Sequence, residues 1–182
     1  IQIPHNNSLN AFPFSVSAWV KSSDLSPGHI IGKYENATWN GWTLWSDPKG
    51  SGFYLRGRNS ALISGYDDYP EFSTSPVNDN SWHNLVFVAD QYSGRIYLDG
   101  VLQDTQLWRG TPGVANSSWP MIIGYYAHTY VGIGTETGYF NGATDDIGVW
   151  GRALTDVEVQ QLYSLQRTAT YLWSTGETTA TI

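Results

Sequence analysis

Two separated stretches decide the fold of this chain: SWHNLVFVADQYSGRIYLDG at residues 81–100 and FNGATDDIGVWGRALTDVEVQQLY at residues 140–163. In the first part of the first stretch, successive side chains belong alternately to one face and the other, as in a β-strand. Ser93-Gly94 then predicts a turn, and residues 95–98 predict the strand that returns. The first stretch therefore predicts a β-hairpin.

The second stretch predicts a strand at residues 145–150 and a helix at residues 155–165. Thr155 can cap the helix, and Glu158 sits three residues on, which is the capping-box pattern. Apolar and aromatic residues then share one helical face, at Val159, Leu162 and Tyr163. We expect this helix to have a structural role and to close one end of the fold.

The rest of the chain repeats the pattern of strands and turns. Clusters of Gly, Pro, Asn and Asp separate the candidate strands and mark turns. Strands that recur at short spacing with few helices are typical of a sandwich or jelly roll. The sequence therefore predicts an all-β fold of two antiparallel sheets. The further predicted strands cover residues 12–21, 30–33, 41–46, 53–58, 61–65, 101–106 and 121–126.

Together, the two stretches resemble the laminin-G-like, concanavalin A-like domain of the jelly-roll superfamily. The family pattern is a WH pair that opens a strand, a YxDG hairpin, and a late F-x-G-x-x-D-D-x-x-x-[YW]-x-R-A-L-[ST] before a helix that ends in Leu-Tyr. All of these positions are filled here. The resemblance covers residues 1–165 and implies a jelly-roll sandwich with one short C-terminal helix. Because this fold hosts lectins, adhesion modules and some enzymes, the resemblance alone does not set the function.

The composition changes after residue 165. Residues 168–182, TATYLWSTGETTATI, are rich in Thr. They resemble the opening strand of immunoglobulin-like repeats in multidomain secreted bacterial proteins. We predict that residues 166–182 are a linker and the start of an immunoglobulin-like module, so that neighbouring domains are covalently linked.

Charge and composition exclude several classes of partner. The chain has 182 residues, enough for one domain with a sizeable core, and its net charge is −7. Its nine Lys and Arg form no basic run, which argues against nucleic acid and anionic membranes. No run of about 18 apolar residues predicts a membrane span. The chain has no Cys, which excludes disulfides and fits a secreted or cell-surface module of bacterial origin.

Catalytic motifs are missing. Sandwich glycosidases of this superfamily carry Glu residues a few positions apart on one strand, because retaining hydrolysis needs two carboxyl groups about 5 Å apart. No two Glu residues lie close in this sequence, no lyase strand motif is present, and there is no G-x-S-x-G elbow. The four His residues show no metalloprotease spacing. We therefore expect the chain not to be an enzyme.

The resemblance implies a metal site at Asp145 and Asp146, which match the Asp pair of the family pattern. In the wider superfamily a carboxylate at this strand start often holds structural Ca²⁺, which takes six to eight oxygen ligands. By strand alternation, Asp145, Ile147 and Val149 share one face, and Asp146 lies on the other. The alternative is that both Asp residues only accept hydrogen bonds from turn amides.

Aromatic residues are the candidates for ligand binding. A Trp or Tyr ring can stack on the apolar face of a sugar, while polar side chains bond its hydroxyl edge. Residues 125–139 form a Gly-rich stretch that we predict to be a long binding loop. Tyr126, His128 and Tyr130 are the first candidates, with Trp39 and Arg58 as weaker ones.

Other aromatic residues have a structural alternative. The resemblance places Trp19, Trp82 and Trp150 at packed positions. Burial in an aromatic-rich core is an equal alternative for Trp42, Trp45 and Tyr54. The sequence thus predicts a non-catalytic carbohydrate-binding module of a larger secreted or surface protein. The alternatives are a structural or adhesion spacer module that binds protein and, in third place, a polysaccharide-active enzyme.

Overall fold

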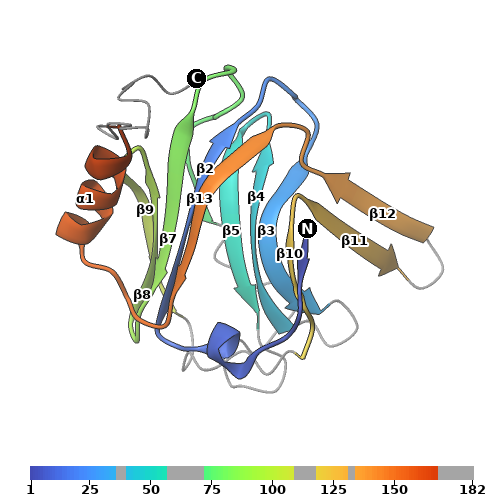
Figure 1. Ribbon diagram of the computed structural model, residues 1–182, viewed down its shortest axis with the longest axis horizontal. Helices are drawn as coiled ribbons and strands as arrows, with labels where there is room; N and C mark the ends of the chain where they lie inside the picture. Colours follow the sequence, from blue (N-terminus) through green and yellow to red (C-terminus); the bar gives the residue numbers. More distant parts are fainter. Residues whose placement is uncertain (36–39, 57–71, 109–117, 131–133, 168–182) are drawn as a thin grey trace, which may run out of the picture.

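The chain folds into two β-sheets packed face to face, with one α-helix on the outside (Figure 1). The structure is a computed structural model and describes residues 1–35, 40–56, 72–108, 118–130 and 134–167. The predicted all-β, jelly-roll-like sandwich with one C-terminal helix is confirmed. The predicted strand at residues 61–65 and almost all of the predicted linker and immunoglobulin-like start lie outside the described residues.

Among the described residues, five strands form the sheet next to the helix, which we call the five-stranded sheet. The strand order is β13-β2-β7-β8-β9, and every neighbouring pair is antiparallel. β7 and β8 are the hairpin predicted from the first stretch. The bounds are Phe14–Lys21 for β2, His83–Ala89 for β7, Ser93–Leu98 for β8, Val101–Leu107 for β9 and Ala143–Trp150 for β13.

The turn of this hairpin lies earlier than predicted. β7 ends at Ala89 and β8 already begins at Ser93. The Oδ1 atom of Asp90 accepts hydrogen bonds from the backbone N–H groups of Tyr92, at 2.7 Å, and Ser93, at 2.8 Å. Because an Asp side chain closes the turn in this way, Ser93 and Gly94 can enter the strand.

In the described part of the chain, the other sheet has eight strands, and we call it the larger sheet. Its main order is β1-β10-β3-β4-β5-β6. The hairpin of β11 and β12 joins it where β12 meets β3, and extends away from the sandwich (Figure 1). The bounds are Gln2–Ile3 for β1, Gly28–Glu35 for β3, Asn40–Asp47 for β4, Gly50–Arg56 for β5, Phe72–Ser73 for β6, Met121–Ile123 for β10, Tyr125–Tyr130 for β11 and Gly134–Tyr139 for β12.

The hydrophobic core lies between the two sheets. Alternate residues of β2 point into it, and Val16 and Val20 are fully buried. The rings of Phe53 in β5 and Phe87 in β7 stack across the sandwich with centroids 3.5 Å apart. Trp42 is 2% exposed in the same cluster, so burial in the core is the correct alternative for this residue.

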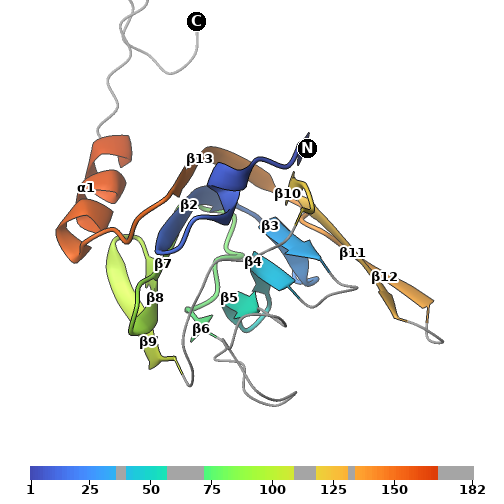
Figure 2. The ribbon, with the colours of Figure 1, turned by 90° about the horizontal axis from the view of Figure 1, so that it is seen from below.

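β7 is buried on both faces. Leu85 and Phe87 face the core, whereas Val86 and Val88 pack with Val159 of the helix. The helix α1, Asp156–Arg167, therefore lies on the outer face of the five-stranded sheet (Figure 2). The expectation that it closes one end of the sandwich is wrong, because the helix packs on the outward-facing valines of β7.

The predicted capping box at the start of α1 is confirmed. The backbone N–H of Glu158 donates to Thr155 Oγ1 at 3.3 Å, and the N–H of Thr155 donates to Glu158 Oε2 at 2.8 Å. The first turn is also tied to β8, because Arg95 and Tyr97 both donate to Asp156 Oδ1, at 2.6 and 2.7 Å. Among the residues that the structure describes, no helix is both long and apolar enough to cross a lipid bilayer.

Candidate functional site

The stretch predicted to be a long binding loop is a β-hairpin. β11 and β12 pair over six Cα pairs, from Tyr125 with Tyr139 to Tyr130 with Gly134. The loop prediction is therefore wrong. The physical reason is that both arms are rich in Tyr and Thr, which favour strands.

The three first candidates lie on one strand of this hairpin. Tyr126, His128 and Tyr130 occupy alternate positions of β11, and alternate positions belong to one face of a strand. Their Cα partners in β12 are Gly138, Glu136 and Gly134 in the same order. The side chains of the three candidates lie outside the described part of the structure, and so do Trp39 and Arg58 altogether.

Two further tyrosines form an aromatic pair at the base of the hairpin. The rings of Tyr125 and Tyr139 lie with centroids 4.5 Å apart, and Tyr139 is 64% exposed. In the loop expected from the sequence, these two residues were its opposite ends. Their pairing depends on the register of the hairpin, which the sequence alone did not specify.

Next to this pair, His29 lies at the junction between the hairpin and the larger sheet. Its Cα partner in β4 is Trp45, and its Cα partner in β12 is Tyr139. The Nδ1 atom of His29 is 3.0 Å from Thr43 Oγ1. The Thr43 hydroxyl donates to the carbonyl oxygen of Ile31 at 3.3 Å. Thr43 thus links the imidazole of His29 to the backbone of β3.

Two glycines let the rings of this region lie close to the backbone. A Cβ atom on Gly138 would be 2.7 Å from Cδ2 of His29, and a Cβ on Gly52 would overlap the indole of Trp45. Each ring therefore lies directly against a neighbouring strand. Because Leu44 belongs to the core, Trp45 is on the outer face of the larger sheet. We call His29, Thr43, Trp45, Gly52 and Gly138 the His29 cluster.

The His29 cluster and the predicted binding residues are neighbours. Gly138, which contacts the ring of His29, is also the Cα partner of Tyr126. Sequence reasoning missed His29 and Thr43 and treated Trp45 as possible core. The only signal for these residues in the sequence was that glycine-rich strands also carry aromatic or polar residues.

The predicted metal ligands lie elsewhere, on β13 at the edge of the five-stranded sheet. Asp145 is opposite Trp19 and Gly148 is opposite Ser17, so three steps along β13 match two steps along β2. This bulge adds one residue and places Asp145 on the same outer face as Gly148. The prediction that Asp145 shares a face with Ile147 is therefore wrong.

Asp145 and Asp146 are both exposed and serve the bulge itself. Asp145 Oδ1 accepts from the backbone N–H of Asp146 at 2.8 Å, and Asp146 has a φ of 45°. In the described residues, no group of three or more His, Cys, Asp or Glu side chains could hold a metal ion. Two carboxylates do not supply the six to eight oxygens that Ca²⁺ takes, so the described residues alone do not fit it. Calcium stays a prediction that needs further ligands.

The structure places the three tryptophans that were expected to pack in different environments. Trp19 stacks on Tyr163 of α1 with ring centroids 5.8 Å apart. Trp150 packs against the cluster beneath α1. Trp82 is 42% exposed, so the packing prediction is wrong for this residue. It directly precedes β7 of the five-stranded sheet, whereas the His29 cluster belongs to the larger sheet.

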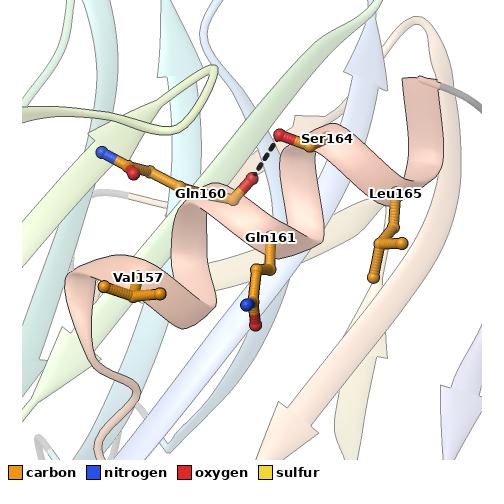
Figure 3. Close-up of a pocket in the computed structure, with 5 residues that line it drawn as sticks. All are labelled: Val157, Gln160, Gln161, Ser164 and Leu165. Atoms are coloured by element: carbon orange, nitrogen blue, oxygen red, sulfur yellow. Dashed lines mark hydrogen bonds between the residues drawn. The ribbon is translucent and has the colours of Figure 1, made fainter.

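One surface hollow lies on the outer side of α1 (Figure 3). It is lined by Val157, Gln160, Gln161, Ser164 and Leu165, which carry no charge. This hollow belongs to the helix on the five-stranded sheet, whereas the His29 cluster belongs to the larger sheet. Its lining has no group that could act as an acid or a base, and we do not assign it a catalytic function.

Comparison with known proteins identifies the fold family. A family model described as the concanavalin A-like lectin/glucanases superfamily matches residues 1–160. No curated protein matches the chain.

Several solved structures share the fold. The receptor binding domain of botulinum neurotoxin C/D mosaic serotype has a TM-score of 0.64 and 13% identity, over 91% of this chain and 39% of that chain. The binding domain of Paraclostridial Mosquitocidal Protein 1 has a TM-score of 0.67 and 18% identity, over 94% and 42%. The binding domain of botulinum neurotoxin DC in complex with SialylT has a TM-score of 0.64 and 18% identity, over 96% and 41%. The chain thus spans about two fifths of the length of these structures. Their TM-scores show a shared fold, and at such low identity the likeness extends to the fold alone.

Proposed function

Because the chain belongs to the concanavalin A-like lectin/glucanases superfamily, we propose that it is a non-catalytic carbohydrate-binding module. The glycan binds along the surface that runs from the β11–β12 hairpin to Trp45. The module acts as an accessory part of a larger secreted or cell-surface protein. Its parent is bacterial and carries covalently linked domains, of which residues 166–182 begin an immunoglobulin-like one.

The observation that carries this proposal is the position of His29 beside Trp45, on the outer face of the larger sheet and next to the hairpin. Trp45 lies against Gly52, and the ring of His29 faces Gly138 of β12. A sugar needs an aromatic face for its C–H groups and polar atoms for its hydroxyl groups. The His29 cluster offers both within adjacent strands, and Tyr126 follows next to it in the hairpin.

The solved structures with this fold support binding over catalysis. They are binding domains, and one of them was solved in complex with SialylT. Another comes from botulinum neurotoxin type C, whose cell entry is dependent upon interaction with two ganglioside molecules. The ligands of these relatives in fold support a carbohydrate ligand for this chain as well.

Glu158, one of the five Glu residues of the chain, has a structural role. The pKa of Glu158 is lowered to about 2, first by its hydrogen bond from Arg152 and then by the backbone N–H of Thr155. A carboxylate held in its charged form by a helix cap is unsuited to act as a general acid. The absence of enzymatic activity remains a prediction for the whole chain.

A protein-binding module is the second candidate. One solved structure with the same fold is the binding domain of botulinum neurotoxin DC in complex with rat synaptotagmin II. On this alternative, the exposed Tyr139 would contact a polypeptide instead of a sugar.

A glycan-array screen of the purified chain, with and without EDTA, tests the proposal. We expect binding to a restricted set of glycans, and calorimetric titration of the best binder then gives the affinity. Release of reducing ends or unsaturated products from a polysaccharide panel, abolished by a point mutation in this chain, would show an enzyme instead. No binding to any glycan would reject the carbohydrate proposal and favour the protein-binding candidate.

A further inference from the structure

The outer face of α1 differs from the usual surface of an amphipathic helix. Val159 and Leu162 pack on the five-stranded sheet, and the opposite face of the helix carries the surface hollow (Figure 3). A helix face that meets only water is typically rich in charged residues. Residues 159–166, however, contain no Lys, Arg, Asp or Glu, and the charged residues of α1 lie near its two ends. The outer face is therefore suited to contact with another segment of protein.

Two aliphatic side chains are exposed on this outer face. Val157 is 62% exposed and Leu165 is 68% exposed, and both line the hollow. The Ser164 hydroxyl donates to the backbone carbonyl of Gln160 at 2.8 Å, so this polar group is directed onto the helix itself (Figure 3). The hollow has a volume of about 530 Å³. Clefts of roughly 300–1,000 Å³ hold drug-sized ligands, so this hollow has room for large side chains of a partner segment.

The acidic residues of the first turn add no charge to the hollow. Asp156 accepts hydrogen bonds from Arg95 and Tyr97 of β8. Glu158 accepts hydrogen bonds from Arg152. Neither carboxylate lines the hollow, which is therefore neutral. Because burial of an unpaired charge is unfavourable, the hollow favours a partner segment that is also uncharged.

The chain itself supplies such a segment directly after α1. Residues 168–176, TATYLWSTG, contain no charged residue and include the large apolar side chains of Tyr171, Leu172 and Trp173. The segment lies outside the described residues and starts only three residues after Leu165. A short covalent connection gives an effective concentration on the order of millimolar, so even a weak contact with the hollow would be populated.

The dimensions of the helix and of the segment are compatible. α1 rises 1.5 Å per residue, so the hollow extends roughly 15 Å back from Arg167 to Val157. The six residues 168–173 span up to roughly 20 Å when they are extended. If the chain turns back after α1, Trp173 can therefore reach every part of the hollow.

We propose that residues 168–182 turn back after α1 and pack on its outer face, where Tyr171, Leu172 and Trp173 cover the hollow. The helix is then held between the five-stranded sheet and the segment that follows it. The start of the next module is fixed against the β-sandwich and is not joined to it by a loose linker. This contact belongs to the five-stranded sheet, whereas the proposed glycan surface belongs to the larger sheet, so the inference goes beyond the proposed function and does not depend on it.

Limited proteolysis of the whole chain tests the proposal. Chymotrypsin cleaves after aromatic residues, so the rate of cleavage after Tyr171 and Trp173, followed by mass spectrometry, reports whether the segment is covered. Leu165→Gln removes one aliphatic side chain of the hollow and retains a good helix former. We expect this variant to be cleaved at least fivefold faster than the wild type. Leu107→Gln is the matched control and should be cleaved at the wild-type rate, because Leu107 is 72% exposed at the end of β9.

Trp173→Ala gives a second readout and leaves the described residues of the β-sandwich unchanged. An aromatic ring shifts the resonances of nuclei that lie near it. Loss of the Trp173 indole should therefore move the backbone amide signals of residues 157–165 in nuclear magnetic resonance spectra. Thr179→Ala, in the same segment, is the control and should leave these signals in place.

The two measurements decide the proposal together. Equal cleavage rates in the wild type, Leu165→Gln and Leu107→Gln would overturn it, and so would unchanged α1 signals in Trp173→Ala. Protection that develops only as the protein concentration rises would assign the hollow to a second copy of the chain and would also overturn it. Circular dichroism shows whether each variant is folded, and if Leu165→Gln is not, the Trp173→Ala spectra decide alone. The glycan-array screen tests the proposed function separately.

Discussion

The Nδ1 atom of His83 lies 2.8 Å from the Oδ2 atom of Asp99, which ties the first residue of β7 to the turn between β8 and β9. The other ring nitrogen, Nε2, lies 3.1 Å from Asp79 Oδ1. Asp99 Oδ1 also accepts the backbone N–H of Asn84 at 2.8 Å. One imidazole therefore holds three chain segments together.

This arrangement makes stability depend on pH. Burial lowers the pKa of His83, but hydrogen bonds to Asp99 and Asp79 and the charges of both carboxylates outweigh it, so the net pKa is raised above 6.5. The stabilisation is therefore complete below the unfolded-state pKa of about 6.5 and is lost as the pH rises through the folded-state pKa. We expect chemical denaturation to give a free energy of unfolding that falls over this range.

A histidine substitution checks the assignment. His83→Gln should remove most of this pH dependence, whereas His5→Gln should retain it, because His5 is exposed near the N-terminus. An unaltered pH profile in His83→Gln would assign the effect to another group.

The cap of α1 gives a second prediction with the opposite sign. The pKa of Glu158 is lowered to about 2, so its contribution to stability is present above the unfolded-state pKa and is lost as the pH falls towards 2. Glu158→Gln should therefore destabilise the chain at neutral pH, and the difference from the wild type should shrink on acidification. Thr155→Ala should cost about 1 kcal/mol, a typical effect of losing a cap.

Thermal and denaturant unfolding monitored by circular dichroism measure both changes. Thr105→Ala, at an exposed position of β9, is the control for a threonine outside the cap. Equal effects of Thr155→Ala and Thr105→Ala would contradict a specific contribution of the capping box.

The residues first chosen in the hairpin give a third prediction. Single carbohydrate modules with one or two stacked sugars bind with Kd on the order of 0.1–1 mM, or about 4–5.5 kcal/mol. Each stacked ring contributes about 1 kcal/mol beyond burial of area. Tyr126→Ala and Tyr130→Ala should each weaken binding about fivefold with little change in melting temperature, as measured by calorimetry. Unchanged affinity in both would place the ligand elsewhere, and a large loss of stability would show that the rings are structural.

Gly138 connects the hairpin to the His29 cluster and gives a fourth prediction. In Gly138→Ala the new Cβ would be 2.7 Å from Cδ2 of His29, so the imidazole must move. We expect glycan affinity to fall about fivefold, equivalent to about 1 kcal/mol, and the His29 ring signals to shift in nuclear magnetic resonance spectra. Gly151→Ala, whose Cβ would meet only Ala11 at 3.2 Å, is the matched control. The same affinity in both variants would separate His29 from the binding surface.

Calcium gives the fifth prediction. If Asp145 or Asp146 contributes to a site that also draws on other ligands, Ca²⁺ binding to the native state stabilises it by about 2.7 kcal/mol at a hundredfold excess over Kd. The melting temperature should then fall in EDTA and recover with added Ca²⁺, and Asp145→Asn should reduce the response. If neither EDTA nor Ca²⁺ changes the melting temperature, the calcium prediction is wrong and the two carboxylates serve only the bulge.

The fold was predictable because its signals are local. Alternation along β2, the two-sided apolar pattern of β7 and the Thr155–Glu158 cap each arise within one element, where side-chain spacing follows directly from backbone geometry. The helix position was not predictable in the same way. Whether Val86 and Val88 face a second sheet, solvent or a helix depends on what the rest of the chain places beside them.

The candidate site was predictable only in part. Their residue types in a Gly-rich stretch identified Tyr126, His128 and Tyr130 as candidates, and the structure puts their backbone on one strand, where the sequence predicted a loop. No pattern near Asp145 in the sequence predicts the bulge that places this residue on the other face. The bulge is defined by the register of β13 against β2, which is set by the tertiary structure.

By itself, the sequence determined the class of fold, the strand periodicity, the cap of α1 and the type of residue available for binding. Tertiary structure alone decided which of these residues meet. His29, Trp45 and Tyr139 lie in three strands that are separate in the chain and become neighbours through backbone hydrogen bonding of β3 to β4 and of β12 to β3. Strand pairing depends on contacts between distant segments, so local spacing carries no information about it, and the surface that we propose for glycan binding exists only once the larger sheet has formed.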